Sequence, residues 1–199
     1  MPTELDIAEL APARREAWRQ IRLAGRRAGR HRTEALDTLG RMFRQGSAPL
    51  EPLDGPYDGI LVTTTTWRLT DPAFRVLASA WMPWMGKRFH AGDQSGDNLL
   101  VPSARVPARL FWPRYRLEDT GDGRHVAFRF RTYTSPGTLD PDIDTLKIDY
   151  DSPDNPGFLI RDILDELVEV APGAYLGKVL LRRRGGWRLV GYFALQPSV

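Results

Sequence analysis

The chain has 199 residues, of which 42% are hydrophobic and 27% charged, a composition typical of one soluble globular domain with a single core. It contains no cysteine, which excludes disulfides, thiolate metal sites and a thiol nucleophile. The three histidines are well separated in sequence, which argues against a zinc site, and a formal net charge of +3 is weak support for nucleic-acid binding.

The N-terminal stretch MPTELDIAELAPARREAW carries acids where a secretory signal needs basic residues followed by an apolar run. No apolar stretch in the sequence approaches the length that crosses a membrane. We therefore expect a cytoplasmic protein without a transmembrane segment.

An arginine-rich segment, RREAWRQIRLAGRRAGRHR, covers residues 14–32. Trp18 and Ile21 fall on one helical face and arginines on another, which predicts a helix over about 5–27, and a second is expected over about 32–45. Such a face can lie on an anionic membrane or a nucleic acid, or it is solvated while Trp18 and Ile21 pack on the domain. Because the whole chain prefers arginine to lysine, we expect no specific nucleic-acid binding and at most weak membrane-surface contact.

After this segment the composition changes from polar to β-forming. Residues 47–56 are rich in proline and glycine and predict a linker. Short runs of β-branched and aromatic residues then predict strands, namely YDGILVTTTTW, RHVAFRFRTYT, DTLKIDY, AYLGKVLLRRR and GWRLVGYFAL. The last two flank the turn signal Arg184 to Gly186 and predict a hairpin. Short helices are expected over 71–84 and 155–167.

Many short strands without alternating long helices indicate an antiparallel sandwich or barrel rather than a parallel sheet. We therefore expect three parts in the chain. A basic helical extension covers 1–46, the linker covers 47–56, and a mainly β (α+β) domain with short helices covers 57–199.

Several motifs in this domain resemble one family. GPYDG, residues 55–59, has the Gly-x-aromatic-x-Gly form that opens the lipocalin-like (calycin) barrels, and it resembles the GXWXG domain, with Tyr57 in place of the usual Trp. WMGKRF (84–89) and IDYDSPDNP (148–156) are similar to further segments of that domain and of its companion domain of unknown function. The last two strand runs are similar to their closing hairpin. The resemblance implies a small closed antiparallel barrel and leaves the biochemical role unassigned.

The two glycines of GPYDG can also be explained by backbone geometry and packing. The first glycine permits a tight turn into the opening strand, and the second leaves room for another element to cross that strand closely. The aromatic ring between them can plug one end of a barrel.

Strand alternation assigns residues to two faces. In the strand from 125, one face carries Val126, Phe128 and Phe130, and the other carries His125, Arg129, Arg131 and Tyr133. In the next strand, Leu146, Ile148 and Tyr150 oppose Lys147 and Asp149. Either the polar faces meet solvent around a sealed apolar barrel, or they point inward, where paired arginines would hold a carboxylate or phosphate.

The candidate ligand-binding residues follow from these patterns. Trp81 and Trp84, at the end of the helix expected over 71–84, form either a lid over the barrel mouth or core between helix and sheet. The full set is Tyr57, Trp81, Trp84, Lys87, Phe89, Arg129, Arg131, Lys147, Tyr150 and Tyr192.

The candidate acid and base groups are Asp149, His125 and Tyr133. His125 or His90 is also either a haem ligand or an ordinary structural histidine.

No Gly-x-Ser-x-Gly elbow, P-loop or dinucleotide fingerprint is present, so hydrolase, kinase and dehydrogenase activities lack their usual signatures. The acid-rich residues 135–155 show no EF-hand register. We expect no cofactor and no metal.

These observations favour a lipocalin-like barrel that binds a small hydrophobic or amphipathic molecule with an acidic or carbonyl group. One alternative is a cofactor-independent isomerase or cyclase that uses Tyr, Asp and His side chains in the same cavity. A third hypothesis is an interaction module whose arginine-rich helix binds a nucleic acid or a membrane.

Overall fold

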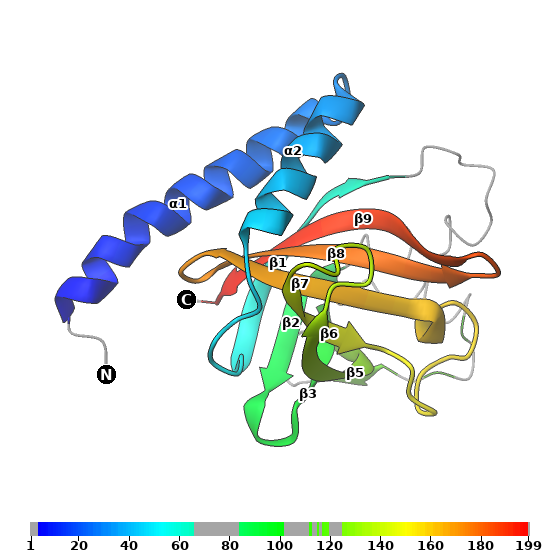
Figure 1. The fold of residues 1–199 in the computed structure, drawn as a ribbon. Coiled ribbons are helices and arrows are strands. Elements are labelled where there is room, and N and C mark those ends of the chain that lie inside the picture. The colour runs from blue at the N-terminus through cyan, green and yellow to red at the C-terminus, as the bar shows by residue number, and fades with distance from the viewer. Residues whose placement is uncertain are drawn as a thin grey trace.

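The computed structural model describes residues 4–65, 84–101, 112, 115, 117–119 and 125–198. Over these residues the chain begins with two helices, α1 (Glu4–Arg27) and α2 (Arg32–Gln45), as the sequence predicted. The strands that follow are β1 (Gly55–Thr64), β2 (Trp84–His90), β3 (Ser95–Leu100), β4 (Glu118–Asp119), β5 (His125–Pro136), β6 (Asp144–Asp149), β7 (Ile163–Ala171), β8 (Ala174–Arg183) and β9 (Gly186–Pro197) (Figure 1).

Eight of the described strands form a closed antiparallel barrel. Hydrogen bonding runs in the order β3-β2-β1-β9-β8-β7-β6-β5, and the pairing of β3 with β5 closes the ring. The short β4 pairs with β5 as one additional strand. β8 and β9 form the predicted hairpin, in which Arg183 pairs with Gly186. The fold is therefore mainly β with an N-terminal helical extension, which confirms the prediction.

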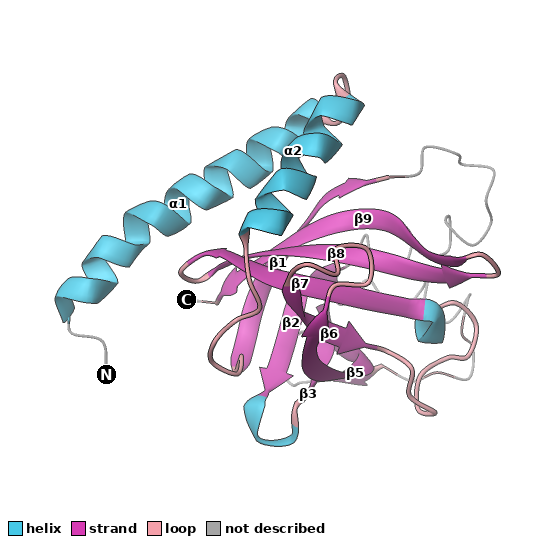
Figure 2. Cartoon of the chain, viewed as in Figure 1, coloured by secondary structure: helices cyan, strands magenta, loops and turns pink. Residues whose placement is uncertain are grey.

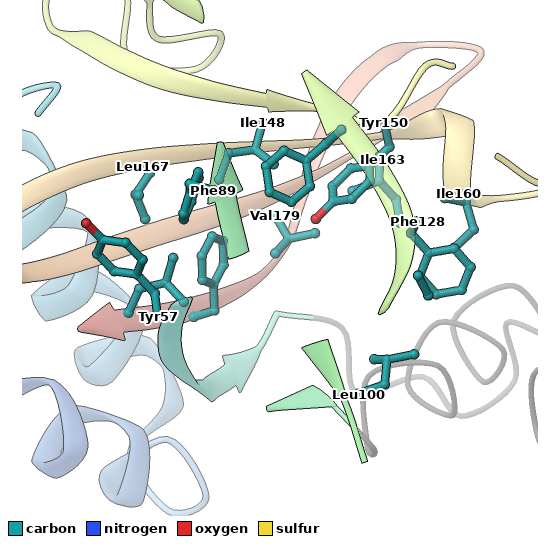
Figure 3. Close-up of a cluster of buried hydrophobic side chains, with 14 of the residues drawn as sticks. Tyr57, Phe89, Leu100, Phe128, Ile148, Tyr150, Ile160, Ile163, Leu167 and Val179 are labelled. Carbon is teal, nitrogen blue, oxygen red and sulfur yellow. The ribbon is translucent and has the colours of Figure 1, made fainter. Parts of the chain in front are cut away.

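The barrel interior is filled by one of two apolar clusters (Figure 3). Tyr57 contacts the edges of two other rings, with ring centroids 5.3 Å from Phe89 and 5.8 Å from Tyr175. Leu53, which precedes β1, belongs to the same cluster. A barrel of eight strands is just wide enough to be filled by side chains, and these aromatic residues fill it.

The second cluster joins the helices to the outer wall of the barrel. Trp18 and Ile21 of α1 and Phe43 of α2 are buried together with Leu176 and Ala194 from the sheet. Figure 2 shows the two helices on one side of the strands. The expected packing of Trp18 and Ile21 on the domain is confirmed. Neither described helix is long and apolar enough to cross a membrane.

The prediction of a helix over residues 155–167 is wrong. The chain makes a 3-10 turn, η3 (Ile160–Asp162), and then enters β7. The spacing of apolar residues there resembles one face of a helix because β7 is buried on both faces. Leu167 lies in the interior cluster, whereas Val168 lies beneath the helices.

Trp84 also differs from the prediction, since it is the first residue of β2 rather than the last residue of a helix. The rest of the helix predicted over 71–84, including Trp81, lies outside the described residues.

A bulge in β5 corrects the predicted faces of that strand. Gly96 pairs with Phe130, but Asn98 pairs with Ala127, so β5 has one extra residue, and Phe128 there has a φ of 52°. A bulge reverses the alternation of side chains beyond it. His125 therefore shares the face of Ala127, an interior residue, instead of the face of the arginines further along β5.

Gly59 leaves room for a side chain from the neighbouring strand. A Cβ atom on Gly59 would lie 2.4 Å from the Trp84 indole. The Trp84 ring in turn packs edge-on against Phe193, with centroids 5.7 Å apart. The close crossing that the sequence predicted at this second glycine is thus made by the Trp84 side chain.

Gly59→Ala should lower the free energy of unfolding by about 1 to 3 kcal/mol, because the added methyl group overlaps the indole in a filled interior. Gly92→Ala is the control, because a Cβ atom there meets nothing within 4 Å. Urea unfolding measures both changes. Trp84→Leu should recover part of the loss in a Gly59→Ala background, and equal effects of the two glycine substitutions would contradict the close crossing.

Candidate functional site

A group of polar side chains lies buried inside the otherwise apolar barrel. It consists of Lys87, Asn98, Tyr150 and Asp165, and we call it the Lys87 cluster. Lys87 on β2 and Asn98 on β3 are directly paired, Tyr150 follows β6, and Asp165 lies on β7. The Lys87 side chain is only 2% exposed. Barrel closure thus brings polar groups from four segments to one point in the interior.

Hydrogen bonds connect all four side chains. Lys87 Nζ donates to Asn98 Oδ1 at 3.0 Å, to Asp165 Oδ2 at 3.0 Å and to the Tyr150 hydroxyl. The Tyr150 hydroxyl in turn donates to Asp165 Oδ2 at 3.1 Å. An ammonium group has three protons to donate, and here each has an acceptor. The cluster is therefore arranged to hold Lys87 as a cation paired with the Asp165 carboxylate.

Asn98 is fixed in position by bonds at both ends of its amide. Its Nδ2 donates to the backbone oxygen of Phe128 at 3.2 Å, and its Oδ1 accepts a bond from Trp84 Nε1 at 3.1 Å. The Phe128 carbonyl belongs to the bulge in β5. The bulge and the Trp84 indole therefore both help to orient the amide that contacts Lys87.

Aromatic rings surround the ammonium group. The centroids of Trp84, Phe130, Tyr150 and Phe193 lie between 5.0 and 5.6 Å from Lys87 Nζ. A cation is attracted to the face of an aromatic ring at such distances. These rings also exclude water, so the charges of the cluster interact in a medium of low polarity.

Burial shifts the ionisation of three members of the cluster. It lowers the pKa of Lys87, with Asp165 opposing the shift, and it raises the pKa of Asp165, with Lys87 opposing. Burial also raises the pKa of Tyr150 well above its usual value, and the carboxylate of Asp165 adds to that shift. Each shift disfavours the charged form, so the ionised pair reduces stability near neutral pH. Perturbed groups beside a cavity are characteristic of functional sites.

A small cavity of about 10 Å³ adjoins the cluster. It is lined by three polar residues, Lys87, Asn98 and Asp165, and by three apolar side chains, namely Leu61, Trp84 and Phe193. This volume is about the lower limit for one water molecule. Asp165 Oδ1 has no hydrogen-bond partner within the described part of the chain, so it can accept a bond from a guest molecule.

The structure brings some predicted ligand-binding residues together in the barrel. Trp84, Lys87 and Tyr150 meet in the Lys87 cluster and its ring of aromatic side chains. Tyr57 and Phe89 lie in the same interior cluster of apolar residues. Trp81 lies outside the described residues.

The two arginines predicted to bind an anion point to solvent, so the arrangement with both inside the barrel is wrong. Their side chains are 61% and 67% exposed, for Arg129 and Arg131 respectively. Arg131 pairs with Asp149 at 2.8 Å, and Arg129 lies 3.4 Å from Glu118. Water and surface carboxylates satisfy these guanidinium groups at a much lower desolvation cost than the interior would impose.

Two further predicted residues lie outside the barrel lumen. Lys147 is buried, but its partner is Glu166, which lies opposite it on β7 and faces away from the interior. Tyr192 belongs to the second apolar cluster, beneath the helices. Neither side chain belongs to the Lys87 cluster.

The three predicted acid and base residues do not form one site. Arg131, Asp149 and Tyr133 lie close together on the outer face, where Asp149 bonds to Arg131 and the guanidinium lies 6.0 Å from the Tyr133 ring. His125 is eight residues from Tyr133 along β5, about 25 Å away at the usual rise per residue. His125 is nonetheless buried on the interior side of its strand, directly paired with Leu100.

Sequence reasoning missed Asn98 and Asp165. Asn98 lies between Phe89 and His125, in a stretch that no recognised motif covers. Asp165 lies within the segment that was predicted to be helical. The available signal was its position between Ile163 and Leu167 on one strand face, because an acid in an apolar row is unusual unless it is paired.

Comparisons with known proteins add no assignment. No family model matches the chain, and no curated protein matches it. It is similar to a crystal structure of a protein from Thermomonospora curvata, with 16% sequence identity and a TM-score of 0.47, over 88% of this chain and 99% of that one. A resemblance at this level supports no functional conclusion. Among the described residues, no group of three or more His, Asp or Glu side chains could hold a metal ion.

Lys87→Met should lower the free energy of unfolding by about 3 to 5 kcal/mol, because Asp165 then remains buried without its cation. The double variant Lys87→Met/Asp165→Leu should be as stable as the native chain or more stable by about 1 to 4 kcal/mol, since both buried charges are removed. Urea unfolding measures both, with Arg131→Met as the exposed-pair control, for which a change within about 1 kcal/mol is expected. A double variant as unstable as Lys87→Met would mean that the fold itself requires the ion pair.

Proposed function

We propose that the protein binds a small hydrophobic or amphipathic molecule inside the barrel, with the polar end of the molecule on the Lys87 cluster. The observation that supports this is a hydrogen-bonded lysine, tyrosine, asparagine and aspartate beside a cavity with apolar walls. A buried ion pair rarely stabilises a fold better than well-packed apolar residues would, so its presence calls for another reason. Ligand binding supplies one, and the closed eight-stranded barrel is compatible with the lipocalin-like ligand-binding architecture.

The charge of the cluster favours a neutral polar group over an acid. Lys87 and Asp165 carry one charge of each sign and already neutralise each other. A carboxylate ligand would bring a second anion next to Asp165 in a medium where charges are poorly screened. A neutral carbonyl oxygen can instead accept a bond from Lys87 or Tyr150 without this repulsion. We therefore propose an aldehyde, ketone or similar neutral carbonyl compound as the ligand class.

The cavity volume sets a condition on ligand size. About 10 Å³ admits a group the size of a water molecule, so a larger apolar tail needs a side chain to move. Trp84 is only partly buried and lies at the first position of β2. Leu61, which also lines the cavity, is 38% exposed. We propose that a tail leaves the cavity between these two side chains.

Binding should be stronger for 2-hexanone than for hexanoate, because only the acid places a second anion beside Asp165. Lys87→Met/Asp165→Leu should weaken 2-hexanone binding about tenfold or more, since a hydrogen bond to a charged group contributes roughly 1.5 to 3 kcal/mol. Arg129→Met, which removes an exposed cation from the same barrel, is the control and should leave binding unchanged. Isothermal titration calorimetry measures these affinities, and preferential binding of hexanoate or equal effects of the two variants would overturn the proposed orientation.

Acid–base catalysis in the same cavity remains the second candidate, and the observation that favours it is the position of Asp165. Its Oδ2 accepts bonds from both Lys87 and Tyr150, so a proton can pass among these three groups, two of which, Lys87 and Asp165, line the cavity. An isomerase or cyclase would use these residues rather than Asp149 and Tyr133, which lie on the outer face.

We propose that the arginine face of α1 has no specific nucleic-acid target and that residues 1–46 serve as an extension of the barrel. The guanidinium of Arg22 lies 5.4 Å from the Trp18 ring, and Arg19 pairs with Glu16 at 2.6 Å on an exposed surface. Trp18 is buried against the sheet, so it does not present a ring on which bases could stack.

The triple variant Arg15→Gln/Arg19→Gln/Arg22→Gln should change the affinity for a random DNA duplex by less than tenfold at physiological salt. Only weak charge-dependent binding is lost when these exposed arginines are removed. Fluorescence anisotropy at several salt concentrations measures it. Tight binding by the native chain, with a steep salt dependence that disappears in the variant, would contradict the proposal.

A further inference from the structure

We infer that Lys87 forms a reversible imine with a small aldehyde or ketone bound in the cavity. This inference rests on the proposed binding of a carbonyl compound and specifies the chemistry that follows binding. It requires an amine beside the cavity, a neighbouring group that can take and return a proton, and a second donor near the carbonyl oxygen. The Lys87 cluster supplies all three within hydrogen-bond distance.

The amine and its proton acceptor are already in contact. Lys87 lines the cavity, and its Nζ lies 3.0 Å from Asp165 Oδ2. Burial disfavours the ammonium form of Lys87 and the carboxylate form of Asp165, so transfer of a proton from one to the other relieves both penalties. The free amine produced is a nucleophile, whereas the ammonium is not.

The second donor is Tyr150. Its hydroxyl contacts both Lys87 Nζ and Asp165 Oδ2, and burial keeps it protonated because the pKa of the phenol is raised. The single proton of this hydroxyl is donated to Asp165 Oδ2 in this structure, and it becomes available to a carbonyl oxygen beside Lys87 once Asp165 has taken the proton of Lys87. That contact polarises the carbonyl carbon toward attack by the amine.

The steps balance without an added reagent. Asp165 takes one proton from the Lys87 ammonium, the nitrogen lone pair forms a bond to the carbonyl carbon as the C=O π bond opens, and Asp165 returns that proton to the carbonyl oxygen to give a carbinolamine. A second proton, passed from nitrogen through Asp165 to the hydroxyl, allows water to leave. The product is a protonated imine at Lys87 beside the Asp165 carboxylate, so the charge of the buried pair is the same before and after. Hydrolysis reverses the sequence.

The chain has few lysines, so modification of Lys87 can be distinguished from modification of the others. The chain has 28 basic residues, but its lysines are only Lys87, Lys147 and Lys178. Lys147 pairs with Glu166 and Lys178 with Asp140, and both are as deeply buried as Lys87. These two lysines do not line the cavity beside the cluster. They are internal controls that share burial and ion pairing with Lys87 and lack its cavity.

The experiment uses the full chain with hexanal and sodium cyanoborohydride, which reduces an imine to a stable secondary amine, followed by intact-mass and peptide analysis. We expect one alkyl group on Lys87, at least tenfold more than on Lys147 or Lys178. Lys87→Arg keeps the cation and should abolish that modification. Asp165→Asn should slow it at least tenfold, because the proton acceptor is lost. Lys147→Met breaks another buried pair and should leave the rate unchanged, which separates loss of proton transfer from loss of stability.

The outcomes separate this inference from the proposed function. If 2-hexanone binds and depends on the Lys87 cluster but hexanal leaves Lys87 unmodified, the imine is refuted and ligand binding stands. If 2-hexanone does not bind and Lys87 is unmodified, both proposals fail. Modification of the three lysines to the same extent, or of the N-terminal amine alone, also overturns the imine.

Discussion

The pairing of β3 with β5 is the constraint on which the rest of the structure depends. It closes the sheet into a ring, so the barrel strands have neighbours on both sides and the interior has a fixed width. Each inward position must then be occupied by a side chain that fits its neighbours. The bulge at Phe128 lies in this closing pair of strands, and its carbonyl holds Asn98 in place. Closure and the orientation of the polar cluster are therefore linked.

The Lys87 cluster sets a cost in stability against the proposed function. Its charges are removed from water, and burial opposes the ionised form of both Lys87 and Asp165. An apolar filling of the same space would avoid that penalty. The penalty also brings the amine and the carboxylate closer to exchanging a proton, and this is the property that carbonyl chemistry requires. A cost in folding free energy can thus be retained because it adjusts reactivity.

The other buried lysines have a different role. Lys178 pairs with Asp140 and lies 4.2 Å from the ring of Phe43, while Lys147 pairs with Glu166 on the outer wall of the barrel. The Lys178 pair joins the loop before β6 to β8, and the Lys147 pair joins β6 to β7. Each is a lysine paired with a carboxylate, and each is about as deeply buried as the pair in the lumen. The adjoining cavity and the surrounding aromatic rings distinguish Lys87, so the proposed function rests on the site and not on the ion pair alone.

The sequence by itself determined the local elements, because helix spacing, strand composition and turn signals act over a few residues. It predicted both N-terminal helices, the closing hairpin and the mainly antiparallel sheet. It also placed Lys87 and Tyr150 among the candidate residues. Only the tertiary structure decided which faces point inward, since a single bulge moved His125 away from the face of Arg129. Tertiary contacts also joined Lys87 to residues 11, 63 and 78 positions away. Asp165 was missed because β7, buried on both faces, has the apolar spacing of a helix.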